Sequence, residues 1–154
     1  MSTMPDGTLP ADDRWLVFHL AGQRYAAPLS SVGEVIRDGE VTPVPGAAPD
    51  LLGIRHLRGR IVPVLDGARR FGLASTGTDG EQARIVVLVH DGHRVGLRVD
   101  AVGELLVADA DAVTPPPGRP AREDDPVEGV LAWRDGFVAL LDVRRLCRLP
   151  AAAA

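Results

Sequence analysis

A pair of aspartates offers the most direct candidate for chemistry in this chain. Asp66 and Asp142 each follow an apolar run, and two aspartates that share a proton can act together as acid and base. An aspartic protease needs Asp-Thr-Gly or Asp-Ser-Gly, whereas the residues after these aspartates are Gly67-Ala68 and Val143-Arg144. Each aspartate also precedes a short helical pattern with an arginine three residues on. That context is typical of a helix N-cap, so we interpret both aspartates as structural.

The histidines, the cysteine and the serines give no stronger site. His90-Asp91-Gly92-His93 could supply two metal ligands, but the motif spans a hairpin turn and lacks companions. Cys147 lies near Leu146 and Leu149 in a short helical pattern, so we expect a buried thiol. Ser30 and Ser31 stand outside any Gly-x-Ser-x-Gly context, and the chain has no glycine-rich phosphate loop. The sequence therefore predicts no catalytic residue, no metal site, no cofactor and no enzyme activity.

Composition excludes several further classes. The 154 residues are 45% hydrophobic and 25% charged, which is typical of a folded domain. A net charge of -4 disfavours a general nucleic-acid binder, which needs a basic excess. No apolar run approaches the roughly 18 residues of a membrane span. A single cysteine fits a reducing compartment, and the N-terminus lacks signal-peptide character, so we expect a cytoplasmic protein.

The chain is expected to be all-β with short connecting helices. Runs rich in Val, Ile and Leu recur between glycines and prolines, as strands do. These runs cover residues 15–20, 24–29, 41–44, 54–57, 61–65, 85–90, 95–99, 102–107, 130–133 and 137–141. Asp91-Gly92 and Asp135-Gly136 predict two-residue hairpin turns, because both turn positions need positive φ. Helical patterns are confined to residues 29–32, 67–71 and 143–147.

The chain also repeats itself. At an offset of 70 residues, residues 15–35 align with 85–105, including Val32-Gly33-Glu34-Val35 with Val102-Gly103-Glu104-Leu105. At an offset of 76, residues 53–69 align with 129–145. Each copy supplies about five strands, and five short antiparallel strands commonly close into a small barrel. We therefore predict two similar five-stranded, SH3-like β-barrels packed side by side.

The repeat also predicts where the domain divides. We expect an N-terminal tail over residues 1–13 and a first barrel over about 14–74. A loop at residues 75–83 would lead to a second barrel over about 84–149, with a tail at 150–154. The excess residues around 118–126, rich in proline and charge, should form a surface loop.

Arginines give the best indication of a binding face. Arg55, Arg58 and Arg60 fall within six residues, whereas the corresponding segment of the second copy carries only Arg134. Arginine is enriched at interface hot spots, although a solvated strand edge remains an equal alternative for this cluster. Glu34 and Glu104 occur in both copies, so the shared fold is enough to explain them.

Several segments together resemble the CheW family of chemotaxis coupling proteins. They are residues 15–20, 23–26, 32–36, 52–54, 56–59, 61–66 and 95–100, with the closing Gly129-Val130 and Leu140-Leu141-Asp142. The resemblance covers roughly residues 14–149, and Leu57-Arg58-Gly59 followed by Val62-Pro63-Val64 is its most specific part. The chain departs from the family pattern at His56, where Asn is usual, and at Gly67-Ala68, where Leu-Arg is usual.

The resemblance implies a function as well as a fold. CheW proteins are non-enzymatic, two-barrel adaptors that link the cytoplasmic tips of chemoreceptors to the regulatory domain of a CheA-type histidine kinase. By resemblance, the protein would sit at receptor arrays under the inner membrane and reach the membrane only through receptors. Receptor contacts would fall in a groove between the barrels, near Val32, Glu34, Gly53, Arg58 and Leu105.

The resemblance leaves the output and the docking surfaces open. One face of the first barrel would dock the kinase, and the second barrel could complete rings with another kinase regulatory domain. Service in a pilus-based or non-motility array, or binding of the kinase without a receptor, are alternatives. From the length of 154 residues we expect an adaptor alone, without a kinase catalytic domain or a receiver domain.

Overall fold

The computed structural model describes residues 13–73, 80–108, 112–115 and 126–147. Within these residues, ten strands and three short helices follow one another along the chain. They are β1 (Arg14–Leu20), β2 (Gln23–Pro28), the 3-10 helix η2 (Leu29–Ser31), β3 (Val32–Arg37), β4 (Leu51–Leu57), β5 (Arg60–Asp66), α1 (Gly67–Arg70), β6 (Arg84–His90), β7 (His93–Val99), β8 (Ala101–Val107), β9 (Val127–Trp133), β10 (Gly136–Leu141) and α2 (Val143–Cys147). The predicted tails at 1–12 and 150–154, and the predicted loop as far as residue 79, lie outside the described residues.

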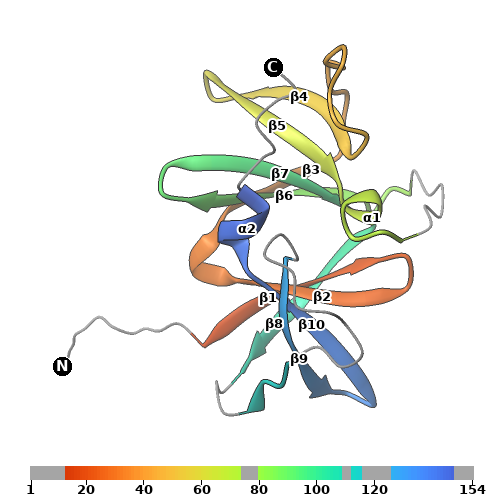
Figure 1. Ribbon diagram of the computed structural model, residues 1–154, viewed down its shortest axis with the longest axis vertical. Helices are drawn as coiled ribbons and strands as arrows, with labels where there is room; N and C mark the ends of the chain where they lie inside the picture. The colour runs from red at the N-terminus through yellow and green to blue at the C-terminus, as the bar shows by residue number, and fades with distance from the viewer. Residues whose placement is uncertain (1–12, 74–79, 109–111, 116–125, 148–154) are drawn as a thin grey trace.

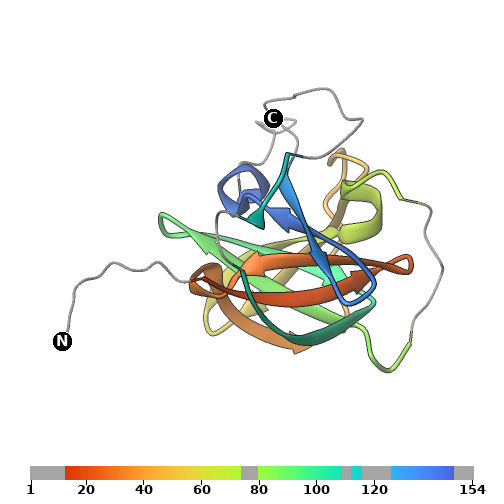
Figure 2. The same ribbon diagram turned by 90° about the horizontal axis from the view of Figure 1, so that it is seen from below.

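The strands form two five-stranded sheets, as the predicted fold class requires. Sheet A has the order β8-β1-β2-β10-β9, and sheet B has the order β3-β6-β7-β5-β4. Figure 1 shows sheet B above sheet A with α2 between them, and in Figure 2 the strands of sheet A lie in front. None of the described helices is long and apolar enough to cross a membrane.

The predicted division into consecutive barrels is wrong, because the two copies exchange strands. Sheet A combines β1 and β2 of the first copy with β8, β9 and β10 of the second, and sheet B combines the complementary five strands. The exchanged parts are joined by parallel pairs, β2 with β10 and β5 with β7, so the sheets are not wholly antiparallel. An exchange leaves every local pattern unchanged, and for that reason the repeat could not reveal it.

Each sheet closes on itself through the segment that leaves its edge strand. After β3, the chain returns to the opposite edge of sheet B, where Thr42 and Ile54 exchange backbone hydrogen bonds of 2.8 and 2.9 Å. Thr114 and Val130 make the equivalent bridge in sheet A. Pairing both edges in this way removes exposed strand templates that would otherwise promote aggregation.

The central strands are apolar on both faces because each face meets a different core. On β1, Phe18 faces the core between the sheets, whereas Val17 faces the interior of sheet A. On β6, Leu88 and Val87 divide in the same way between the shared core and the interior of sheet B. This double burial explains the continuous apolar runs, since a strand with one solvated face would alternate with polar residues.

Two of the predicted local details need correction. Residues 41–44 form no strand and contribute only the bridge at Thr42, whereas residues 32–37 form β3. The hairpin turn before β10 is Arg134-Asp135, with φ of 48° and 62°, and not Asp135-Gly136. The Asp91-Gly92 turn is confirmed, with φ of 51° and 79°.

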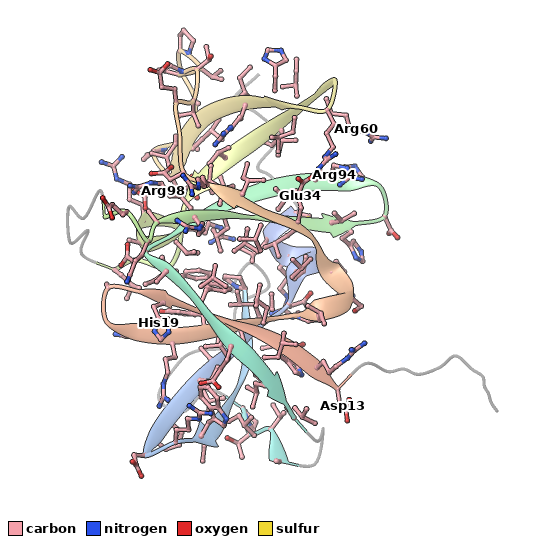
Figure 3. The ribbon with its side chains drawn as sticks, turned by 180° about the vertical axis from the view of Figure 1, so that it is seen from behind. Asp13, His19, Glu34, Arg60, Arg94 and Arg98 are labelled. Carbon is pink, nitrogen blue, oxygen red and sulfur yellow. The ribbon has the colours of Figure 1, made fainter. Side chains whose placement is uncertain are left out.

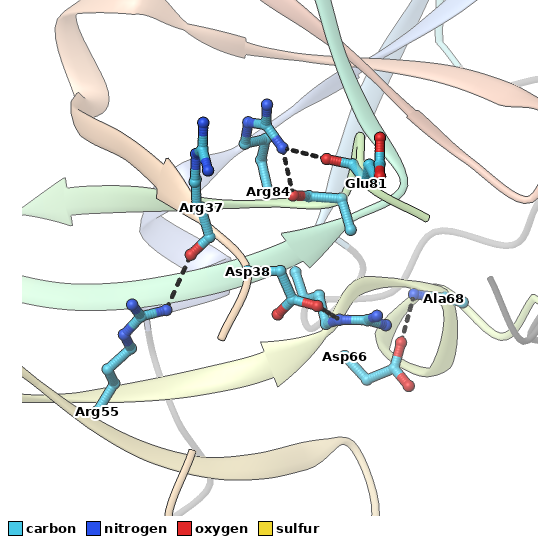
Figure 4. Close-up of polar contacts among 9 residues, drawn as sticks. Arg37, Asp38, Arg55, Asp66, Ala68, Glu81 and Arg84 are labelled. Carbon is cyan, nitrogen blue, oxygen red and sulfur yellow. Dashed lines mark hydrogen bonds and ion pairs between the residues drawn. The ribbon is translucent and has the colours of Figure 1, made fainter. Parts of the chain in front are cut away.

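The short helices fall where the sequence places them, and Asp66 caps α1 as predicted. Its carboxylate accepts a hydrogen bond from Ala68 N at 3.1 Å (Figure 4). Gly67 in this first turn is buried, and a Cβ on it would lie 2.6 Å from the carbonyl oxygen of Arg98 on β7. Glycine at this position therefore serves close packing of α1 on sheet B.

Candidate partner-binding site

An open hollow on sheet B brings together three of the five predicted site residues. Val32 and Glu34 come from the edge strand β3, and Arg58 comes from the turn between β4 and β5. The hollow has a volume of about 490 Å³. Its other walls are Ser30, Gly33, Leu57, Arg60, Val62, Val87, Val89 and Arg94. These residues come from the strands of sheet B, from the turn at Arg58 and from η2, which connects the two sheets.

Arg58 and Glu34 face each other across the seam between the two edge strands of sheet B. The Nε of Arg58 lies 3.4 Å from Oε2 of Glu34, and the two side chains are 81% and 25% exposed. An exposed ion pair of this kind is worth about 0–1 kcal/mol. Arg58 therefore adds little to stability, and its guanidinium stays accessible to a partner.

The same ion pair recurs in sheet A. Arg134, at the equivalent turn between β9 and β10, donates to Oε2 of Glu104 at 2.8 Å. Both arginines adopt positive φ, 50° at Arg58 and 48° at Arg134, as the two-residue turns require. The pair is therefore part of the repeated architecture, and any difference in binding must come from its surroundings.

The surroundings of the two ion pairs differ most at the residue before the arginine, which is Trp133 in sheet A and Leu57 in sheet B. In sheet A the Trp133 ring is contacted by two guanidinium groups, that of Arg134 at 4.7 Å and that of Arg24 at 5.2 Å from the centroid. Arg24 also donates to the carbonyl of Trp133 at 2.9 Å. In sheet B the corresponding residue is Leu57, which cannot stack with arginine.

The remaining two predicted residues lie apart from the hollow. Gly53 on β4 has φ of 155°, and a Cβ there would lie 2.4 Å from the carbonyl oxygen of Thr42. Its glycine is required by the bridge that closes sheet B. Leu105 is 51% exposed on β8, which belongs to sheet A, and it is not among the residues that line the hollow.

The predicted arginine cluster is divided by the structure. Arg55 donates to the carbonyl of Arg37 at 2.9 Å, so its guanidinium is held against β3 (Figure 4). Arg58 and Arg60 line the hollow, together with Arg94 from β7 (Figure 3). Arg94 was not among the residues predicted from the sequence. The repeat gave a signal, because Arg94 aligns with Arg24 while Leu57 and Arg60 replace Trp133 and Gly136.

The aspartates and the cysteine that were first considered for chemistry lie in ion pairs or in the core. Asp142 pairs with Arg144 at 3.0 Å and with Arg145 at 3.4 Å. Cys147 is buried as expected, and burial raises the pKa of its thiol to about 11, which disfavours the reactive thiolate. Within the described part of the chain, no group of three or more potential ligands could hold a metal ion.

Exposed apolar side chains stand at equivalent positions of the two sheets. Ile61 on β5 is 60% exposed, and Phe137, its counterpart on β10, is 67% exposed. Val35 and Leu105 form a second equivalent pair on the edge strands β3 and β8. Each sheet thus exposes apolar side chains both beside its turn and on its edge strand.

Comparison with known proteins identifies the family of this two-sheet fold. Residues 14–152 match the family model described as CheW-like domain. The chain belongs to the CheW-like domain family. The structure of the scaffolding protein TtCheW from Thermoanaerobacter tengcongensis superposes with a TM-score of 0.75 at 32% identity, over 84% of this chain and 88% of that one. CheW-like proteins are scaffolds rather than enzymes.

Two relatives show the range of the similarity. A probable chemotaxis protein CheW of Rhizobium etli is 29% identical over 143 residues, which cover 90% of both chains. The protein FrzA of Myxococcus xanthus is 32% identical over 119 residues, covering 74% of both chains. This chain is thus similar both to a protein named for chemotaxis and to FrzA, whose name does not mention chemotaxis.

Proposed function

We propose that this CheW-like protein is an adaptor that couples chemoreceptors to a CheA-type histidine kinase in a cytoplasmic array. The observation that carries the proposal is the exposed Arg58–Glu34 pair at the mouth of the sheet B hollow, beside Val32. Its guanidinium contributes little to folding and is open to solvent. The resemblance to the CheW family assigns these same three residues to receptor contact.

The kinase requires a second surface. Ile61 and Phe137 each expose a large apolar side chain at the start of a strand, one on each sheet. Burial of such side chains contributes about 1.5–3 kcal/mol each, which is enough to anchor a modest interface. In this proposal, one of these surfaces docks the kinase regulatory domain and the other joins the adaptor to a neighbouring kinase in the array. Weak contacts then add through avidity.

Gly53 and Leu105 have different places in the proposal. Gly53 acts indirectly, by allowing the closure of sheet B that holds β3 beside the turn of Arg58. Leu105 contributes a separate apolar contact from sheet A. The receptor would accordingly meet the two sheets at distinct points.

A pull-down with purified protein from a lysate of the source cells tests the proposal. We expect recovery of a CheA-type kinase and a chemoreceptor, and loss of the receptor alone with Arg58→Glu. Arg134→Glu is the matched control, because it breaks the equivalent ion pair of sheet A. Recovery of neither partner by the folded wild-type protein would contradict the proposal.

A second candidate function is service in an array with another output, such as a pilus-based one. The similarity to FrzA supports this candidate, since that relative does not carry a chemotaxis name. The same pull-down separates the two, because the identity of the recovered receptor and kinase defines the array. Recovery of the kinase without any receptor would instead indicate a scaffold that only organises the kinase.

A further inference from the structure

The hollow of sheet B carries an excess of positive charge. Arg58, Arg60 and Arg94 line it, and Glu34 is the single carboxylate among its walls. Glu34 already pairs with Arg58. Arg60 makes no ion pair with any described residue, and the buried Nε of Arg94 has no hydrogen-bond partner among them. A buried guanidinium donor without an acceptor is costly, so Arg94 calls for an explanation.

In sheet A, the arginine equivalent to Arg94 has partners within its own sheet. Arg24, the counterpart of Arg94, donates through Nη2 to the carbonyl of Trp133 at 2.9 Å and stacks on its ring. Gly136 makes room for this arrangement, since a Cβ there would lie 2.4 Å from Nη2 of Arg24. The guanidinium of Arg24 therefore finds both a carbonyl acceptor and an aromatic ring within its own sheet.

Sheet B cannot adopt that arrangement. Arg60 stands where sheet A has Gly136, so its Cβ would occupy the place of the guanidinium nitrogen. Leu57 replaces Trp133 and offers no ring on which to stack. The guanidinium of Arg94 lies instead beside Gly33, where an ideal Cβ would be 3.3 Å from Nη1. Figure 3 shows Arg94, Arg60 and Glu34 close to one another.

We propose that this hollow binds a carboxylate side chain of a protein partner, with Arg94 and Arg60 as its ligands. The apolar walls formed by Val62, Val87 and Val89 suit the methylene groups of a glutamate, and guanidinium groups bind carboxylates in a planar, bidentate way. The net charge of -4 on the whole protein opposes an extended polyanion such as nucleic acid. This inference rests on the proposed function, in that the partner is the chemoreceptor that docks on Arg58.

The test measures the affinity of the full-length protein for a cytoplasmic chemoreceptor fragment by titration calorimetry. Arg94→Gln and Arg60→Gly should each weaken binding by about tenfold or more, as loss of one partner of a desolvated charge pair does. Arg60→Gly is the sharper variant, because it restores the glycine of sheet A and lets Arg94 fold over the turn. Arg37→Gln, which removes an exposed positive charge from β3, should leave affinity within about twofold.

A second arm identifies the bound group. Glu→Gln and Asp→Asn substitutions at the receptor tip should include one whose effect is not additive with Arg94→Gln in a double-mutant cycle. NMR signals of the arginine Nε–H groups are followed during titration with acetate and with inorganic phosphate at constant ionic strength. Acetate should shift the Arg94 signal, and a much stronger response to phosphate would overturn the carboxylate assignment in favour of a free oxyanion.

The outcomes separate this inference from the proposed function. If Arg58→Glu abolishes receptor binding while Arg94→Gln and Arg60→Gly do not weaken it, the carboxylate pocket is wrong and the adaptor role stands. If Arg58→Glu leaves receptor binding unchanged, the adaptor site fails, and the acetate titration alone decides whether Arg94 binds a carboxylate. No response of the Arg94 signal to acetate would then overturn the pocket as well.

Discussion

Replacement of Gly53 by alanine tests whether this residue serves the fold or the receptor. Its φ of 155° is rarely adopted by residues with a side chain, and the added Cβ would lie 2.4 Å from the carbonyl oxygen of Thr42. Backbone strain of this kind costs about 1–3 kcal/mol. Displacement of the Thr42–Ile54 bridge also breaks two hydrogen bonds, worth about 1 kcal/mol each. We therefore expect Gly53→Ala to lose about 3–5 kcal/mol of stability.

Gly59 offers a control on the same hairpin. It also has a positive φ, of 80°, but a Cβ on it would meet nothing within 4 Å. Gly59→Ala should therefore carry only the conformational cost, about 1–2 kcal/mol. For a domain of this size each 1 kcal/mol lowers Tm by about 2–4 °C, so the two variants should be resolved clearly by thermal unfolding followed by circular dichroism.

Receptor binding is then measured below the lower of the two melting temperatures. We expect Gly53→Ala to lose receptor binding only to the extent that it is unfolded or that its sheet B is no longer closed. A Gly53→Ala protein as stable as Gly59→Ala would refute the close-approach argument. A variant of wild-type stability that no longer binds receptor would show that Gly53 contacts the receptor directly.

Three further substitutions or probes test separate parts of the structure. Gly67→Ala should destabilise by about 1–3 kcal/mol through overpacking against Arg98 of β7, whereas helix propensity alone predicts a gain of up to about 1 kcal/mol, so the sign in urea unfolding decides. Partial desolvation and the nearby Asp142 raise the pKa of Glu128, although its side chain is exposed, so the folded state holds this proton slightly more tightly and stability falls modestly as pH rises through the raised pKa. Glu128→Gln should therefore raise Tm at neutral pH, and a gain that persists unchanged below about pH 4 would contradict this origin. Burial raises the pKa of Cys147 to about 11, so iodoacetamide should label it only after denaturation, and rapid labelling of the native protein at pH 8 would contradict its burial.

The fold was predictable from sequence in its elements but not in its pairing. The apolar runs, the internal repeat and the positive-φ turn at Asp91-Gly92 depend on residues that are close in sequence, so they could be predicted. The choice between pairing within a copy and pairing between copies is not local. Each copy offers the same edges and the same apolar pattern to either partner, so the exchange of β1 and β2 leaves no trace in the sequence.

The candidate site was predictable in part for a similar reason. Glu34 and Arg58 are 24 residues apart. The family resemblance places them near each other, but their ion pair depends on the closure of sheet B and was not predicted. Arg94 lies on β7, which adjoins β5 only through a parallel pairing between distant segments. Its unusual state depends on a glycine-to-arginine difference between the copies, at Gly136 and Arg60. The consequence of that difference can be recognised only from the structure, in which Arg24 occupies the space over Gly136.

The most direct test of the account is the activity of a CheA-type kinase reconstituted with chemoreceptor-containing membranes and this protein. The wild-type protein should make kinase autophosphorylation depend on the receptor and its ligand. Arg58→Glu should abolish that dependence while its Tm stays within a few degrees of the wild type, and Arg134→Glu should preserve coupling. Full coupling by Arg58→Glu, or equal loss with Arg134→Glu, would contradict the assignment of the sheet B hollow as the receptor-facing site.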